Sequence, residues 1–148
     1  MAAKLRIVAL SGQAVAETAW LARAEAVHRQ LRPQLPPDYV GRMGEVLAKG
    51  AQLALVVDDD AVLCVALWRV IENTADGRRL YVDDLVSDEN RRSQGAGKMM
   101  LDWLETQAKE QGCSALTLDS GVQRQRAHRF YFREGMYIAS FCFKKALK

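Results

Sequence analysis

The chain has 148 residues, 49% of them hydrophobic and 26% charged, which is enough to bury the core of one domain without disulfides or metals. Its 21 basic and 18 acidic residues leave a formal net charge of +3, which excludes the basic footprint typical of nucleic-acid binders and suits a polyanionic ligand. No apolar run is long enough to span a bilayer, and Cys64, Cys113 and Cys142 lie far apart in apolar surroundings. We therefore expect a single cytoplasmic domain over residues 1–148, with reduced cysteines, no metal and no membrane contact.

Apolar periodicity in the first half of the chain predicts a strand, two helices and a hairpin. The expected elements are a strand over 5–10, helices over 13–31 and 38–47, and strands over 53–57 and 62–71. Asp38 precedes the second helix and Gly50 follows it, as expected of a helix start and stop. We expect His28, a lone histidine, to be a residue of the surface or edge of the first helix and not a ligand.

The second half of the chain alternates strands and helices. The expected elements are strands over 79–87, 114–118 and 138–143 and helices over 98–111 and 123–134. The whole order is then β-α-α-β-β-β-α-β-α-β. This order predicts an α/β fold with a mixed sheet and helices on both faces.

A glycine-rich turn joins the strand over 79–87 to the helix that follows. It reads Arg92, Ser93, Gln94, Gly95, Ala96 and Gly97, with Arg91 before it and Lys98 after it. We expect Gly95 and Gly97 to adopt dihedrals closed to other residues, while the first helical turn offers unpaired N–H groups to an anion. This pattern predicts a phosphate cradle. It is no P-loop, because Met99 follows Lys98 where a hydroxyl is needed, and it lacks the third glycine of a dinucleotide fingerprint.

A second motif follows one strand later, in the helix over 123–134. It reads Ala127, His128, Arg129, Phe130, Tyr131, Phe132, Arg133, Glu134, Gly135 and Met136. Taken alone, Phe130 and Tyr131 are typical of core aromatics on an amphipathic helix. Together with the Arg-x-x-Gly-x-Gly turn, the segment resembles the A-x-x-F-Y-x-x-x-G-F pattern of the GCN5-related N-acetyltransferases (GNAT), with Met136 replacing the final phenylalanine.

The resemblance implies a GNAT fold with splayed central strands and acetyl-CoA as cosubstrate. Residues 92–97 and Lys98 would hold its diphosphate, and the backbone of Leu85, Val86 and Ser87 would pair with its pantetheine arm. Arg124 stands where many members carry a cofactor-binding asparagine. Tyr131 matches the tyrosine that protonates the departing thiolate, a task that suits a phenol because it keeps its proton at neutral pH. Many members also form homodimers through the later strands.

Two adjacent carboxylates precede the glycine-rich turn, and one of them is the candidate base. An ammonium group has no lone pair, so the acceptor must lose a proton before it attacks a thioester. Alternation along the strand predicts that Asp83 and Asp84 project from opposite faces. Asp83 matches the family carboxylate that takes this proton through a water, and Asp84 is the alternative. In the competing interpretation one or both are simply paired with arginines such as Arg79 or Arg124.

The amino-acid sequence at the end of the chain resembles one branch of the family more than the family at large. Four short segments resemble the aminoalkylphosphonate N-acetyltransferases, namely residues 122–124, 127–131, 133–135 and 143–147. We therefore expect a small amine with an anionic end, its ammonium drawn to the acidic pair and its anion held by Arg124 and neighbouring arginines. Two alternatives stay open, namely a non-catalytic module that binds acyl-CoA and an enzyme that acetylates a protein lysine or N-terminus.

Overall fold

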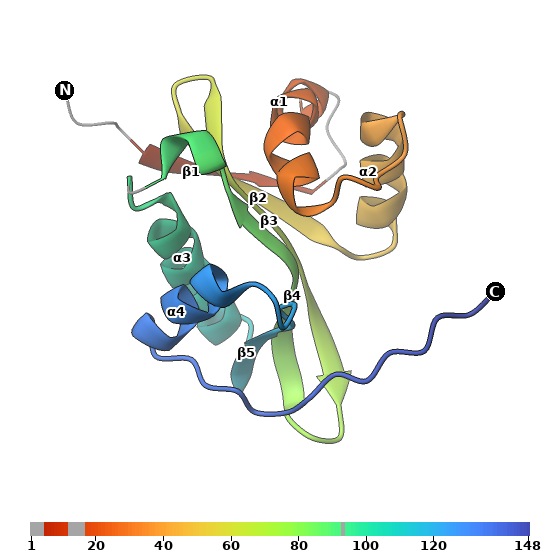
Figure 1. The fold of residues 1–148 in the computed structure, drawn as a ribbon, viewed down its shortest axis with the longest axis vertical. Helices are drawn as coiled ribbons and strands as arrows, with labels where there is room; N and C mark the ends of the chain where they lie inside the picture. Colours follow the sequence, from red (N-terminus) through yellow and green to blue (C-terminus); the bar gives the residue numbers. More distant parts are fainter. Residues whose placement is uncertain (1–4, 12–16, 93) are drawn as a thin grey trace. The chain divides into compact units, whose positions relative to one another are not determined.

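The computed structural model describes residues 5–11, 17–92 and 94–148 (Figure 1). The chain forms two compact units, residues 1–118 and 119–148. The single domain predicted for residues 1–148 stays a prediction. Among the described residues, no helix has the length and apolar character needed to cross a bilayer.

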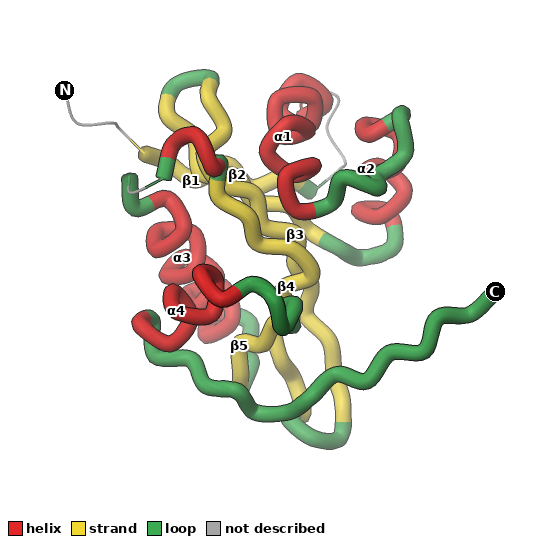
Figure 2. Tube along the Cα trace, viewed as in Figure 1, coloured by secondary structure: helices red, strands yellow, loops and turns green. Residues whose placement is uncertain are grey.

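The first unit is built on one five-stranded sheet in the order β1-β2-β3-β4-β5 (Figure 2). The strands are β1 (Leu5–Leu10), β2 (Gln52–Asp58), β3 (Ala61–Asn73), β4 (Gly77–Ser87) and β5 (Ala115–Leu118). Neighbours are antiparallel from β1 to β4, whereas β4 and β5 are parallel. The predicted mixed sheet is therefore confirmed. Strands β2 and β3 are buried over most of their length, which explains their continuous apolar runs.

Helices cover both faces of this sheet. α1 (Glu17–Leu31) and α2 (Tyr39–Ala48) lie side by side on one face, and α3 (Ala96–Glu110) packs against the other (Figure 1). α2 begins where the sequence predicts, because Asp38 caps it by accepting a hydrogen bond from the N–H of Gly41 at 3.0 Å. The first residues predicted for α1, 13–16, lie outside the described residues.

β5 pairs with only part of β4, and the predicted splay of the central strands stays a prediction. β4 and β5 pair only from Arg79 to Val82 of β4, although β4 continues to Ser87. In this fully described stretch, the carboxyl-terminal part of β4 pairs with β3 alone. The chain then leaves β4 through the 3₁₀ turn η1 (Glu89–Arg91) and enters α3 after the glycine-rich turn.

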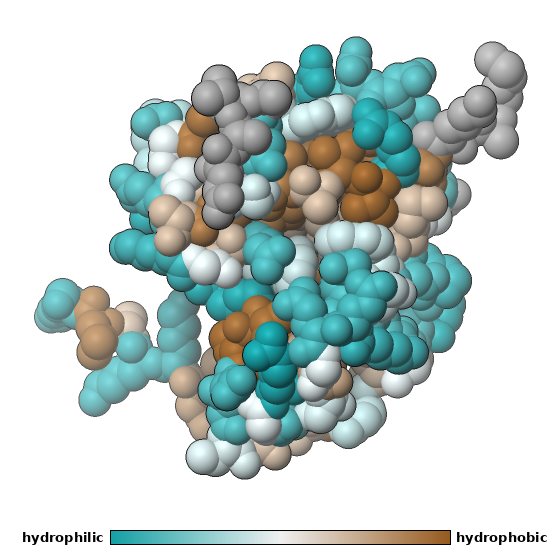
Figure 3. Space-filling view, turned by 180° about the vertical axis from the view of Figure 1, so that it is seen from behind, coloured by the Kyte–Doolittle hydropathy of each residue, from teal (hydrophilic) through white to brown (hydrophobic). Residues whose placement is uncertain are grey.

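The second unit consists of α4 (Gln125–Arg133) and segments without regular structure. Helix α4 confirms the helix predicted here. The strand predicted over 138–143 is wrong, because residues 136–148, all of them described, form neither helix nor strand (Figure 2). Alternating apolar residues meet one requirement of a strand, but its backbone must also pair, and this unit contains no other strand in its described residues. Apolar side chains are consequently exposed along the C-terminal segment (Figure 3), among them Ile138, Phe141 and Phe143.

Candidate active site

Strand β4 carries a bulge at the two candidate carboxylates. Val82 pairs with Trp68 of β3 and Asp84 pairs with Leu67, so Asp83 has no partner and is the extra residue of the bulge. Such an insertion interrupts the regular alternation of side chains along the strand. It therefore changes the direction in which the Asp83 side chain points.

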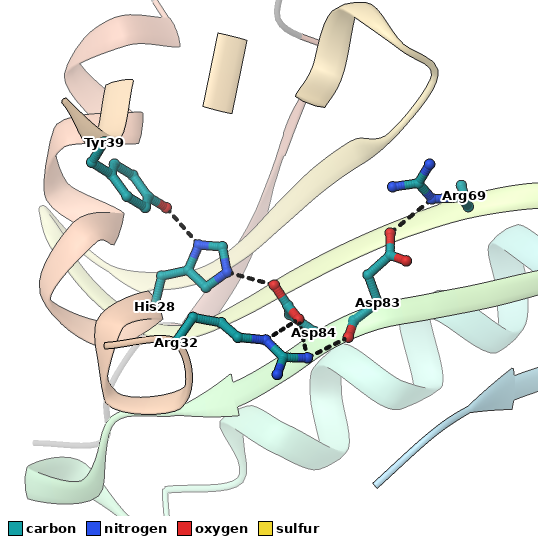
Figure 4. A network of polar contacts seen from close by, with 6 residues as sticks. All are labelled: His28, Arg32, Tyr39, Arg69, Asp83 and Asp84. Carbon is teal, nitrogen blue, oxygen red and sulfur yellow. Dashed lines mark hydrogen bonds and ion pairs between the residues drawn. The ribbon is translucent and has the colours of Figure 1, made fainter. Parts of the chain in front are cut away.

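Asp83 and Asp84 consequently project from the same face of β4 (Figure 4). Leu67 belongs to the core beneath α1 and α2, and Arg69, two residues further along β3, lies on the same face. The Oδ2 of Asp83 accepts a hydrogen bond from Nε of Arg69 at 2.8 Å, while Asp84 contacts His28 of α1. The prediction of opposite faces is therefore wrong, because it assumed a regular strand.

A buried network between β4, α1 and α2 holds Asp84. Its Oδ2 accepts a hydrogen bond from Nε2 of His28 at 2.7 Å, and its Oδ1 accepts one from Nε of Arg32 at 2.8 Å. The other ring nitrogen of His28, Nδ1, lies 2.8 Å from the hydroxyl of Tyr39. The neutral tautomer with its proton on Nε2 satisfies both contacts of His28, because Tyr39 then donates to Nδ1. His28 is completely buried, so the predicted surface position is wrong.

The two carboxyl groups have opposite pKa shifts. Burial raises the pKa of Asp83, the hydrogen bond from Arg69 opposes this increase, and the nearby Asp84 carboxylate adds to it. Burial also disfavours the charged form of Asp84, but the hydrogen bonds from His28 and Arg32 outweigh it and lower the pKa. Asp84 is thus held as an anion, whereas Asp83 takes up a proton more readily.

Arginines contact both carboxylates, although they are not the arginines that the sequence suggested. Asp83 pairs with Arg69, and Asp84 pairs with Arg32. Arg79 instead lies 3.5 Å from Asp76, close to the start of β4. The competing interpretation is therefore right about the presence of ion pairs and wrong about Arg79.

The glycine-rich turn presents an uncapped helix end. Gly95 is the N-cap of α3, in the left-handed conformation with φ 79°, and no described side chain caps the helix. The N–H of Met99 donates to the carbonyl of Gly95 at 3.0 Å, so the earlier N–H groups of the first turn have no acceptor within the helix. A Cβ added to Gly95 would meet no described atom within 4 Å, which leaves room for an anion.

The other residues of the turn differ in their positions. Gly97 lies within the first turn of α3, so the non-helical dihedrals predicted for it are wrong. Arg92, Gln94 and Lys98 are exposed, whereas Ala96 is buried against the unit. The prediction for Ser93 lies outside the described residues.

The end of β4 offers unpaired backbone beside this turn. Leu85, Val86 and Ser87 pair with β3 on one edge, and β5 has already ended at Leu118 on the other. Within the described chain, no strand occupies that second edge beyond Val82. An extended ligand can therefore add there as a strand adds to a sheet.

Tyr131 and Arg124 lie in the second unit. Arg124 immediately precedes α4 as its N-cap residue, and Tyr131 is half-buried with its ring centroid 5.6 Å from that of Phe130. Nε2 of His128 lies 2.8 Å from the carbonyl oxygen of Gly121 and donates to it, which ties α4 to the preceding loop. The roles of Tyr131 and Arg124 towards a cofactor stay predictions.

Sequence reasoning missed Arg32, Tyr39 and Arg69 and misplaced His28. A signal for the histidine was present, because positions 21, 24, 28 and 31 recur at helical spacing and all but 28 are apolar. Arg69 is the one charged residue in the apolar run 62–71, which marks it as unusual. No local pattern pairs either residue with its carboxylate.

Comparisons with known proteins match most of the chain. Residues 17–136 match the model of the acetyltransferase (GNAT) family. YhdJ of Bacillus subtilis, described as an uncharacterized N-acetyltransferase, is 33% identical over 129 residues, which cover 84% of this chain and 89% of the relative. The aminoalkylphosphonate N-acetyltransferase of Salmonella typhimurium is 38% identical over 66 residues, covering 45% of this chain and 43% of that protein.

A solved structure agrees with the fold. The aminoglycoside N-acetyltransferase AAC(6')-Iy, solved in complex with CoA, superposes with a TM-score of 0.83 over 100% of this chain and 97% of that one. The two sequences are 14% identical, so this likeness shows the fold alone.

Proposed function

This chain belongs to the acetyltransferase (GNAT) family, and from that premise we propose that it transfers an acetyl group to the primary amine of a small molecule by direct attack. Acetyl-CoA is the cosubstrate and supplies the activated thioester. Burial raises the pKa of the Cys64 thiol to about 12, so this cysteine is a poor nucleophile. Cys64 is therefore unsuited to carry an acyl group, and direct attack by the amine is our proposal.

The diphosphate fits the uncapped N-terminus of α3. The N–H groups of Ala96, Gly97 and Lys98 belong to the first helical turn, and the open space beside Gly95 suits a phosphate. Arg92 and Lys98 add positive charge at the same turn, and Gln94 adds a polar side chain. The unpaired edge of β4 at residues 85–87 suits the pantetheine arm.

Asp83 is our candidate for the general base, because its raised pKa brings it closer to the pH at which an ammonium proton must be removed. Asp84 is less suited, because both of its oxygens accept hydrogen bonds and its pKa is lowered. The amine proton passes to Asp83 through a water, and the nitrogen lone pair forms the new N–C bond. The C–S bond breaks, and Tyr131 is our candidate to donate a proton to the thiolate. Arg124 is our candidate for a further phosphate contact.

One observation carries this proposal: β4 bears a carboxylate with a raised pKa and leads, through η1 and the glycine-rich turn, to an uncapped helix end. The test is the release of free thiol from acetyl-CoA with a panel of aminoalkylphosphonates, polyamines, aminoglycosides and a lysine peptide. We expect turnover with a small amine, and a loss of roughly a hundredfold or more in kcat for Asp83→Asn.

Asp60→Asn is the matched control, since Asp60 lies in an exposed turn and pairs only loosely with Arg23, at 3.7 Å. It should turn over like the wild type. Binding of CoA without thiol release from any amine would favour a non-catalytic acyl-CoA module. Turnover of the peptide alone would favour protein acetylation.

A further inference from the structure

We propose that Arg69, with the fixed positive charge of Arg32 nearby, provides an anion subsite beside Asp83, which selects acceptor amines that carry a phosphonate or carboxylate group. The inference rests on the proposed function, because it places the reacting amine at Asp83. It assigns the acidic end of the acceptor to the first unit of the chain, and Arg124 has no part in it.

Arg69 presents an unused edge of its guanidinium. It contacts Asp83 through Nε, and its two terminal nitrogens make no hydrogen bond to the described residues (Figure 4). Two adjacent N–H donors match the geometry of an oxyanion. The side chain is 33% exposed, so a solute can reach it while Asp83 holds it in place.

Arg32 is fixed more firmly. Its Nε and Nη2 lie 2.8 and 2.7 Å from Oδ1 of Asp84, and Nη2 also lies 3.3 Å from the carbonyl oxygen of Asp83. Its Nη1 makes no hydrogen bond to the described residues (Figure 4). Because His28 and Tyr39 lock Asp84, little side-chain freedom remains for Arg32 to lose when an anion binds.

The charges of this cluster favour an acceptor with its own negative group. The carboxylates of Asp83 and Asp84 balance the guanidinium groups of Arg69 and Arg32. A plain amine adds positive charge to this balanced set, and a proton transferred to Asp83 leaves that excess within it. An acid group on the acceptor offsets the excess, whereas a polyamine increases it.

The contact between Arg69 and Asp83 also limits the length of the acceptor. An amine that reaches Asp83 through one water and an acid group at the terminal nitrogens of Arg69 are separated by a short span, because Arg69 already touches the carboxylate. A short aminoalkyl phosphonate or carboxylate therefore fits, and a long chain does not.

The test measures binding and turnover separately. Calorimetry gives the Kd of 2-aminoethylphosphonate, and thiol release gives kcat/KM for this amine, for β-alanine and for ethanolamine, which lacks the acid group. The variants are Arg69→Gln and Arg32→Lys. The control is Arg42→Gln, since Arg42 is an exposed arginine of α2 that pairs with Glu45.

We expect the Kd of the phosphonate to rise tenfold or more in Arg69→Gln, about 1.4 kcal/mol, and to stay within about threefold of wild type in Arg42→Gln. Arg69→Gln also disturbs Asp83, so the decisive kinetic quantity is the ratio of kcat/KM for the phosphonate to that for ethanolamine, which should fall. β-Alanine shows whether carboxylates share the subsite. Arg32→Lys keeps the charge but loses the two-nitrogen contact with Asp84, and a fall in the same ratio is expected there.

Thermal unfolding shows which variants are folded. If Arg69→Gln does not fold, Arg32→Lys provides the test of the anion subsite. The inference is overturned if the wild type does not bind the phosphonate, or if every folded arginine variant binds it as tightly as the wild type. Arginine-dependent binding without thiol release from any amine would instead refute the proposed function and support the anion subsite.

Discussion

The substitution Asp84→Asn tests the buried network, because it removes the central anion and leaves the backbone of β4 unchanged. Asp84 accepts charge-assisted or buried hydrogen bonds from His28 and Arg32, and hydrogen bonds to charged groups contribute roughly 1.5–3 kcal/mol each. Removing one partner of a buried ion pair costs about 3–5 kcal/mol. Arg32 has a side chain that is 41% exposed, so water can solvate it once Asp84 is gone. We therefore expect a loss of about 3 kcal/mol, at the lower end of that range.

The pH dependence of this loss has a defined sign. The pKa of Asp84 is lowered in the folded protein, so its stabilising contribution is present above the pKa of the unfolded chain, about 3.9, and disappears as the pH falls through the folded value. Urea unfolding of wild type and variant at a series of pH values measures the difference. It should be largest near neutral pH and shrink towards zero in acid. A difference that stays constant from about pH 7 to about pH 3 would refute the reasoning. Asp60→Asn, in its exposed pair, should change stability by less than about 0.5 kcal/mol.

Three further outcomes are expected. Gly95→Val should weaken CoA binding by roughly tenfold or more in calorimetry, whereas Gly50→Val, which strains a similar left-handed glycine with open space around it, should not. Tyr131→Phe should lower kcat by roughly ten- to a thousandfold with little change in Tm, and full activity would remove Tyr131 from the mechanism. The apparent pKa of the acid limb of the kcat/KM profile should lie above the ordinary aspartate value, about 3.9. It should rise further in Arg69→Gln, because Arg69 opposes the increase in the pKa of Asp83. A lower apparent pKa in this variant would contradict the assignment of Asp83 as the base.

Local signals predicted most of the fold because each acts within a few residues. The N-cap Asp38 and the glycines that follow α2 and α3, Gly50 and Gly112, mark helix ends through their own hydrogen bonds and positive φ. The prediction of a strand over 138–143 was wrong because a strand depends on more than local signals. The apolar alternation at 138–143 describes side chains only, and a strand also needs a neighbour whose position depends on the rest of the fold.

The candidate site was less predictable, because it depends on how the residues of β4 pair with those of β3. A bulge is set by how β4 aligns with β3, and no sequence pattern in β4 indicates that Asp83 is the unpaired residue. Once the bulge is present, two adjacent carboxylates share one face and meet different surroundings. His28 and Arg32 hold Asp84 as an anion, while burial, with a smaller contribution from that fixed charge, raises the pKa of Asp83. Two identical side chains next to each other thus have pKa values shifted in opposite directions, which is the kind of separation that acid–base chemistry uses. In a regular strand the two carboxylates would lie on opposite faces, and only one of them could face α1 and α2.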